Sequence, residues 1–317
     1  MEADEEQKQL LPRSLPPAPR LDPWLVFLHG RRGQNQTFYS LSENRYHVRN
    51  IPNMRRKCFC TSSHGWIVIV DIYSDDCFLL NPVSMDKRQL PSAKSLTYDL
   101  CVLSSSPDDP NCIVLFIRNI KKGRVSVTYC HPGDSDWVMQ DLKLEEDHTT
   151  IERVVCCGGK IYGLTCYYRR LVIFDVGITL TIREVGGENL PESSAPEMCR
   201  YLVNMVESCG ELFVFRRILL GRFEVSDIEV FKMDFSRKVW VTVESLGDRA
   251  FFLSEYCSTS CSVKESGIKG DTIYFIERKD RSLYAFNFED KNITVTLPCP
   301  NVKNHWFEPA EWVLPLV

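Results

Sequence analysis

The sequence predicts an all-β protein, a single β-propeller of about six four-stranded blades, and three observations lead to this fold class. From Trp24 onward, short runs of β-branched and aromatic residues are separated by Gly, Pro, Asn and Asp, a composition typical of strands joined by turns. Helical periodicity is almost absent from the same region. A unit of two strands recurs every 46 to 60 residues, close to the blade period of about 40 to 50 residues.

The N-terminal 20 residues differ from the rest of the chain. A charged start is followed by Pro12, Pro16, Pro17 and Pro19, a composition that neither packs a core nor holds a helix. We therefore expect two parts, a disordered acidic and proline-rich tail over residues 1–20 and the propeller over residues 21–317.

The repeated unit consists of a turn residue, an apolar strand, a polar gap and a second strand. Four copies begin at Gly65, Gly159, Gly210 and Gly270, and a variant copy begins at Asn111. In the four copies the second strand covers residues 77–82, 171–175, 228–234 and 283–287. The pair before the strand at 160–164, residues 158–159, is interpreted as a hairpin turn, because glycine takes positive φ at no steric cost.

The ring must close, because a blade cannot bury both of its faces alone. We expect residues 24–27 to supply a first blade and residues 312–315 to add the outer or inner strand that closes it. Six blades account for these copies. Seven is the alternative, because the stretch 219–253 is long enough to hold a further strand pair.

Charge and length argue against several functional classes. Lys and Arg total 38 against 42 Asp and Glu, so there is no excess positive field for a phosphate backbone and no nucleic-acid partner is expected. The longest apolar stretches, 66–70 and 113–117, are shorter than the roughly 20 residues that cross a bilayer as a helix, so no membrane span is predicted.

The acidic N-terminus is unlike a leader peptide. A cytoplasmic or nuclear location follows, with most of the fourteen cysteines as reduced core thiols.

No motif indicates a catalytic centre, and we predict no catalytic residue, no metal site and no cofactor, with the binding residues left unknown. Cys58, Cys60 and His64 have the residue types of a zinc site, but a structural site needs four ligands. In a strand the two cysteines share one face, which favours core packing. The other close cysteines, which lack the spacing of redox or metal pairs, are Cys156 with Cys157 and Cys257 with Cys261.

Two short basic runs are present, at residues 31–32 and 55–57. We interpret them as solvated loops between blades. The alternative is a nuclear signal or part of a docking face for an acidic partner.

Several segments resemble the plant F-box-associated propellers of the KIB type. The segments that carry the resemblance are residues 63–71, 79–84 with 90–91, 231–235 with 240–241, 245–253, 258–262, 270–275 and 312–315. The resemblance extends from about Trp24 to the end of the chain. It implies a propeller that holds another protein, related to the substrate receptors of F-box ubiquitin ligases.

Members of that family commonly carry an N-terminal F-box, which docks the ligase adaptor. An F-box is helical, and the proline-rich tail does not support a helical pattern. We therefore expect a propeller without an F-box, and no binding of the ligase adaptor. The alternative is that the gene sequence is short and lacks an N-terminal F-box segment.

The leading hypothesis is an interaction module that holds a protein partner of unknown identity, as a substrate-recognition or regulatory unit. Its variable loops, expected on one face, are residues 104–111, 118–124 and 218–227. The alternative is a propeller-class enzyme, a glycoside hydrolase or a kelch-type oxidase, with its centre in the axial channel. That centre needs paired carboxylates, or His, Tyr and Cys ligands on a metal. A third possibility is a relative that has lost its selected activity.

Overall fold

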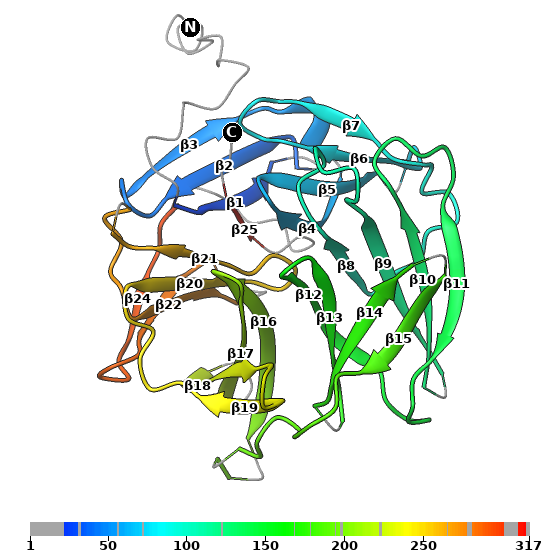
Figure 1. The fold of residues 1–317 in the computed structure, drawn as a ribbon. Helices are drawn as coiled ribbons and strands as arrows, with labels where there is room; N and C mark the ends of the chain where they lie inside the picture. The colour runs from blue at the N-terminus through cyan, green and yellow to red at the C-terminus, as the bar shows by residue number, and fades with distance from the viewer. Residues whose placement is uncertain are drawn as a thin grey trace, which may run out of the picture.

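The computed structural model describes residues 22–314, with gaps at 31–32, 56, 72, 122, 168, 178, 194, 197–198, 222–223, 265, 278–280 and 301–309. Its strands form six sheets arranged around a central axis (Figure 1). The predicted six-bladed β-propeller is confirmed. The predicted tail over residues 1–20 lies outside the described residues.

The first three blades have four antiparallel strands each, which follow one another from the axis outward. Blade 1 consists of β25 (Glu311–Val313), β1 (Trp24–His29), β2 (Asn35–Ser40) and β3 (Arg45–Arg49). Blade 2 consists of β4 (Cys58–Ser63), β5 (Trp66–Asp71), β6 (Asp76–Leu80) and β7 (Lys87–Gln89). Blade 3 consists of β8 (Leu100–Leu103), β9 (Val114–Ile120), β10 (Arg124–Cys130) and β11 (Val138–Lys143). A 3-10 turn, η1 (Pro52–Met54), lies between blades 1 and 2.

The remaining blades complete the ring. Blade 4 consists of β12 (Ile151–Cys157), β13 (Lys160–Thr165), β14 (Leu171–Val176) and β15 (Leu180–Glu184). Blade 5 consists of β16 (Arg200–Ser208), β17 (Glu211–Leu220), β18 (Glu224–Asp234) and β19 (Val239–Thr242). Blade 6 consists of β21 (Thr259–Ser262), β20 (Arg249–Leu253), β22 (Thr272–Ile276), β23 (Leu283–Asn287) and β24 (Ile293–Thr296).

Blade 6 departs from the predicted four-strand pattern, because it has five strands. The extra strand is β20, which pairs with β21 in the antiparallel sense and with β22 in the parallel sense, with Ala250 opposite Thr272. The stretch 219–253, which raised the alternative of a seventh blade, instead contains the end of β17 and the whole of β18, β19 and β20.

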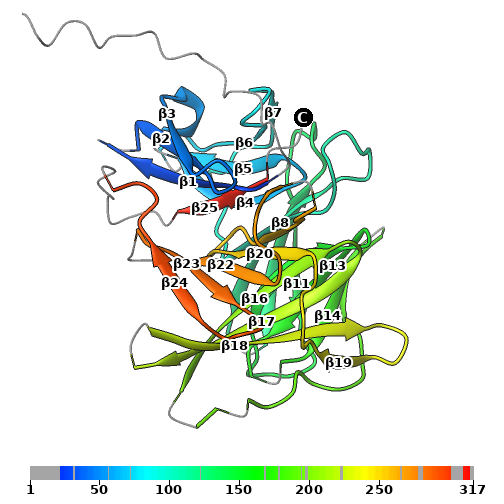
Figure 2. The same ribbon diagram turned by 90° about the vertical axis from the view of Figure 1, so that its left-hand side faces the viewer.

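The ring closes through the C-terminal segment. The strand β25 pairs with β1, placing Trp24 opposite Val313 and Leu25 opposite Trp312. Figure 2 shows the red β25 alongside the blue β1. The prediction that this segment closes the first blade is confirmed, and β25 takes the inner of the two positions that the sequence left open. Pro315 lies outside the described residues.

The core lies between neighbouring blades, because side chains on a strand alternate between the two faces of its sheet. In β5, Val68 belongs to the same apolar cluster as Val114 of blade 3. The flanking Ile67 and Ile69 belong to the cluster that contains Val26 of blade 1. Both faces of the sheet are thus buried, which explains why the strand is apolar at every position.

Tight turns join the first and second strands of blades 2, 4 and 5. Gly158 and Gly159 both have positive φ, at 56° and 71°, as the predicted hairpin turn requires. His64 and Gly65 form the equivalent turn in blade 2, at 52° and 79°. Within the described residues there is no helix long and apolar enough to cross a membrane.

Candidate functional site: the central channel and the connection face

The innermost strands of the six sheets enclose a polar cavity of about 200 Å³ at the axis. Its lining comes from β4, β8, β12, β16, β21 and β25 and from the loop at residues 254–258. The lining side chains with the strongest polar or ionic character are those of His64, Arg153, Asn204, Glu207, Glu255 and Trp312. Ionisable groups therefore converge at the axis, where propellers hold their ligands.

Arg153 extends from β12 into this cavity. Its Nε donates to the Val203 carbonyl oxygen of blade 5 at 2.5 Å, and its Nη1 donates to the Glu152 carbonyl oxygen at 3.0 Å. Burial lowers the pKa of Arg153, while the nearby carboxylates of Glu255 and Glu311 act in the opposite direction. The guanidinium is thus fixed by two neutral backbone acceptors in a region of reduced solvation.

Asn204 lies one residue beyond Val203 and joins blade 5 to blade 6. Its Nδ2 donates to the Ser254 carbonyl oxygen at 2.8 Å and to Ser258 Oγ at 3.1 Å. Because the Ser254 carbonyl can only accept, these bonds fix which end of the amide points toward blade 6. The Asn204 Oδ1 atom is buried and has no hydrogen-bond partner within the described residues.

Glu311 in the closing strand is fully buried. Its Oε2 accepts hydrogen bonds from Ser254 Oγ at 2.6 Å and from the backbone N–H of Cys257 at 2.9 Å. Burial raises the pKa of Glu311 to about 8, although these hydrogen bonds act in the opposite direction. This carboxyl group therefore holds the loop at residues 254–257 against blade 1.

His64 and Glu207 lie where β4 and β16 end. Burial lowers the pKa of His64, and the Glu207 carboxylate opposes that effect. Glu207 Oε1 accepts a hydrogen bond of 2.7 Å from the Gly210 N–H, so this carboxylate also orders the β16–β17 turn. The described residues contain no group of three or more His, Cys, Asp and Glu side chains arranged to hold a metal ion.

More than half of the cysteines lie in the packed interior, whereas Cys209 is exposed. All fourteen are free thiols, and eight of them are buried. Cys60 belongs to the apolar cluster between blades 2 and 3, where its Sγ lies 3.1 Å from Tyr98 Oη. Cys58 is half-buried. A register shift between Phe59 and Thr61 interrupts the pairing of β4 with β5 at this point.

The three variable loops do not share one face, contrary to the expectation from the sequence. Successive turns of an antiparallel sheet lie at alternate ends of its strands. Residues 104–111 follow β8. They lie at the end of the ring where tight turns join the first and second strands of blades 2, 4 and 5, and we call this end the hairpin face. Residues 118–124 and 218–227 lie at the opposite end of the ring. We call this end the connection face, because the segments that link blades 1 to 5 in sequence order lie there. These two segments are largely strand, in the β9–β10 and β17–β18 hairpins.

The connection face displays large apolar and aromatic side chains from five blades. Each follows or ends a strand that runs toward this face. These residues are Tyr73, Ile120, Tyr167, Leu220 and Tyr256, with Tyr73 and Tyr167 about three-quarters exposed. Tyr256 also lines the channel cavity, so the exposed set extends to the mouth of the channel.

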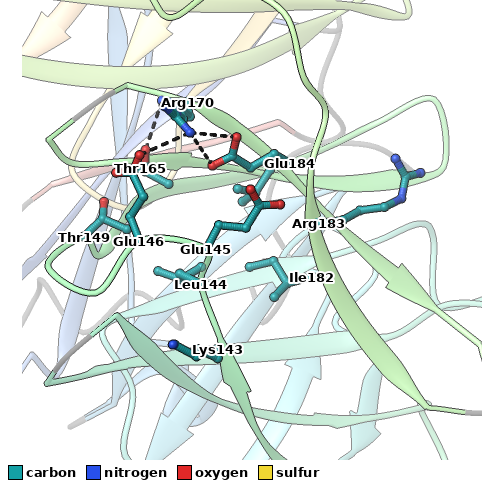
Figure 3. Close-up of a pocket in the computed structure, with 11 residues that line it drawn as sticks. Lys143, Leu144, Glu145, Glu146, Thr149, Thr165, Arg170, Ile182, Arg183 and Glu184 are labelled. Atoms are coloured by element: carbon teal, nitrogen blue, oxygen red, sulfur yellow. Dashed lines mark hydrogen bonds and ion pairs between the residues drawn. The ribbon is translucent and has the colours of Figure 1, made fainter.

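A second pocket on the connection face is filled by an ion network between blades 3 and 4 (Figure 3). Arg170 Nη1 lies 3.0 Å from Glu184 Oε1 and 3.2 Å from Glu146 Oε1. The hydrogen bond to Glu184 raises the pKa of Arg170. The remaining space is about 10 Å³, around the minimum that holds one water molecule. This pocket therefore joins two blades and has no room for a ligand.

The basic run at residues 55–57 is only partly described. Lys57 is not solvated as predicted, because its Nζ forms an ion pair of 2.5 Å with Asp71 and only 13% of its side chain is exposed. Burial would raise the pKa of Asp71, but hydrogen bonds from Lys57 and from the Tyr73 N–H lower it to about 2. Arg56 and the run at residues 31–32 lie outside the described residues.

Sequence reasoning missed Arg153, Asn204 and Glu311. They come from strands of three different blades, and no short motif links residues that are 50 or more positions apart. The usable signal was local: a charged or amide side chain inside an otherwise apolar segment of an innermost strand, where burial demands a partner.

Comparison with known proteins places these features in a family. Two F-box/kelch-repeat proteins of Arabidopsis thaliana are similar to this chain. One is 25% identical over 275 residues, covering 84% of this chain and 74% of the relative. The other is 24% identical over 283 residues, covering 84% and 69%. A further Arabidopsis F-box protein is 29% identical over 122 residues, covering 38% and 31%.

The family model for the KIB1-4 β-propeller matches residues 38–295. This range includes the outer part of blade 1, blades 2 to 5, nearly all of blade 6 and most of the channel lining. The chain therefore belongs to the KIB1-4 β-propeller family.

Proposed function

We propose that this propeller binds a protein partner on its connection face, as a substrate-recognition or regulatory module related to the F-box ubiquitin-ligase receptors. The observation that carries the proposal is the display of Tyr73, Ile120, Tyr167, Leu220 and Tyr256 on one face. Tyrosine supplies a large contact area at low entropic cost and is enriched in protein interfaces. The relatives bear F-box and kelch-repeat names, which supports an interaction role.

The rigid ring suits this role. Each exposed side chain is attached to a strand or to the turn that follows a strand, so little conformational freedom is lost when a partner binds. The ion network of Arg170 with Glu146 and Glu184 fixes blades 3 and 4 relative to each other on the same face. Polar groups at the edge of an apolar patch favour correct docking more than affinity.

We propose that the chain has no catalytic activity of its own. The channel does bring carboxylates together, as the alternative of a propeller-class enzyme requires. However, Glu207 accepts a hydrogen bond from the Gly210 N–H, which supports a structural role for this carboxylate. The described residues offer no metal-ligand group for an oxidase of the kelch type.

A location in the cytoplasm or nucleus remains part of the proposal. Fourteen free thiols suit a reducing compartment, where disulfides are rare. Fluorescence imaging of a tagged chain in plant cells tests this, and a signal confined to the secretory pathway would contradict it.

The test of partner binding is affinity capture of the tagged chain from plant tissue, with and without proteasome inhibitor, followed by quantitative mass spectrometry. The paired substitution Tyr73→Ser and Tyr167→Ser removes two exposed aromatic rings from the connection face. Val176→Ser removes an exposed apolar side chain from the hairpin face and serves as the matched control.

We expect the unmodified chain and the Val176→Ser control to recover the same partner in equal amounts. The double variant should recover at least about tenfold less of it, the equivalent of about 1.4 kcal/mol of binding free energy. Equal recovery by all three would exclude the connection face as the docking surface. Recovery of ligase adaptor and cullin would contradict the expectation that the adaptor is not bound.

A further inference from the structure

We propose that the channel cavity binds a small zwitterion of amino-acid size, with the ligand carboxylate on Arg153 and its ammonium group on Asn204 Oδ1. This site adjoins the proposed protein-docking surface, with which it shares Tyr256, but its occupancy does not require a protein partner.

Arg153 is the anion-binding group. Its two hydrogen bonds go to backbone carbonyl oxygens, and within the described residues it forms no ion pair. Neutral acceptors orient a guanidinium without compensating its charge, and a buried charge is costly unless it is paired. A carboxylate is the planar anion that matches the guanidinium fork.

Asn204 supplies the adjacent acceptor. It is 2% exposed, its Nδ2 is committed to Ser254 and Ser258, and its Oδ1 lacks a partner within the described residues. Because Val203 holds Arg153 and Asn204 is the next residue, a guanidinium without a direct ion pair in the described residues and an unsatisfied acceptor both line the cavity. Buried polar groups in native proteins are normally hydrogen-bonded, so an orphaned one indicates a missing partner.

The charge of the lining calls for a ligand that carries both signs. Glu207 and Glu255 line the same cavity as Arg153, so the lining carries carboxylates as well as a guanidinium. A ligand with negative charge alone would be repelled by these carboxylates, and one with positive charge alone would leave Arg153 without a direct ion pair. A carboxylate next to an ammonium group satisfies both.

The size of the cavity limits the ligand further. At about 200 Å³ it is smaller than the roughly 300–1,000 Å³ of ordinary drug-sized ligand sites, which disfavours nucleotides and peptides. The indole N–H of Trp312, a residue of the cavity lining, has no partner in the part of the chain that the structure describes, so it can donate to a polar side chain of the ligand. The competing occupant is a cluster of ordered water molecules.

The test is a thermal-shift and saturation-transfer NMR screen of the full chain against the free α-amino acids at about 10 mM, a concentration well above the expected Kd. Each is compared with its N-acetyl derivative, which lacks the ammonium group, and with its amide, which lacks the carboxylate. We expect at least one free amino acid to bind with a Kd of about 1 mM, to raise Tm by about 2 °C, and to lose at least about tenfold in affinity when either group is blocked.

Variants assign the binding to the channel. Arg153→Gln and Asn204→Leu are expected to weaken binding at least about tenfold, whereas Arg183→Gln, which removes an exposed arginine from β15, leaves it unchanged. Absence of binding by every free amino acid, equal binding of the blocked derivatives, or full binding by a folded Arg153→Gln variant would each overturn the proposal. The comparison of free with blocked ligands uses the unmodified chain, so it decides the question even where a variant fails to fold.

Discussion

Glu311 Oε2 accepts a hydrogen bond of 2.6 Å from Ser254 Oγ, across 57 positions of sequence. Glu311 lies in β25 of blade 1, whereas Ser254 follows β20 of blade 6. The same oxygen also accepts from the Cys257 N–H. One buried carboxyl group thus connects the two blades between which the ring closes, and it is an ionisable group.

Glu311 makes the stability of the ring depend on pH. Burial raises its pKa from 4.5 in the unfolded chain to about 8, so the folded state keeps the proton while the unfolded state has already lost it. The stability that protonated Glu311 contributes to the folded state is complete below about pH 4.5 and is lost as pH rises through about 8. Between about pH 5 and pH 8, we expect Glu311 to lower the free energy of unfolding by on the order of 3–4 kcal/mol.

Urea unfolding across this pH range checks the prediction. Glu311→Gln keeps a neutral side chain at every pH, so its free energy of unfolding should vary less over this range than that of the unmodified chain. Glu145→Gln, at an exposed position, is the control and should retain the full pH dependence. An unchanged pH profile for Glu311→Gln would show that Glu311 does not titrate in this range.

Trp312 is expected to contribute most of the packing at ring closure. It is 1% exposed and stacks edge-on against Phe252 of blade 6, with ring centroids 4.9 Å apart. Trp312→Ala should lower the free energy of unfolding by about 3–5 kcal/mol, because it leaves a cavity between two blades. Trp312→Phe, which keeps an aromatic ring, should lose about half as much. Chemical denaturation measures both, and a loss below about 1 kcal/mol for the alanine variant would refute this role.

Gly123 is required by a close backbone approach between the β9–β10 turn and the connection from blade 3 to blade 4. Its φ is +64°, and a Cβ at this position would clash with the Glu146 carbonyl oxygen. Gly221 has nearly the same φ, +65°, but none of the described residues has an atom that a Cβ there would meet within 4 Å. Both alanine variants carry the cost of positive φ, about 1 kcal/mol, and only Gly123→Ala adds the clash. We expect the larger loss of Tm for Gly123→Ala, and equal losses would contradict the steric explanation.

Arg217 and Glu277 form an ion pair of 2.8 Å between blades 5 and 6, with only 5% and 15% of their side chains exposed. Burial lowers the pKa of Arg217, and Glu277 opposes this effect. Arg217→Met should cost roughly 3–5 kcal/mol, since it leaves the buried Glu277 carboxylate without this partner. Replacing both residues by Met should cost less than the sum of the single changes. Additive losses in urea unfolding would show that the two groups are not coupled.

The sequence was sufficient for features that depend on local pattern. The turn at Gly158 and Gly159 follows from the ability of glycine to take positive φ. The closing strand around Trp312 follows from an apolar run at the end of a repeating series. The strand β20 could not be predicted in this way. Its pairing of Ala250 with Thr272 is parallel and depends on where the rest of blade 6 packs, which no local periodicity encodes.

The candidate site was the least predictable part. Arg153 and Asn204 each lie in a strand whose apolar pattern already fits a blade, and their relation appears only when blades 4 and 5 are adjacent. The expectation of a single loop face was wrong for a similar reason. Loop length does not indicate a face, because the turns at residues 104–111 and 218–227 belong to opposite ends of the ring, and the alternation of an antiparallel sheet decides which end.

Pairing of β1 with β25 also has a consequence for how the protein is made. Residues 24–26 can pair with residues 311–313 only after almost the whole chain has been synthesised. The hairpins of blades 2 to 5 consist of strands that are close in sequence, so they can form soon after they leave the ribosome. Until the last strand arrives, blade 1 has three strands and an unpaired inner edge, which is a template for aggregation. Long-range closure is also slow to find. We expect the newly made chain to depend on chaperones during this interval, and mutations that weaken the closing strand to reduce the yield of folded protein more than their effect on the finished ring suggests.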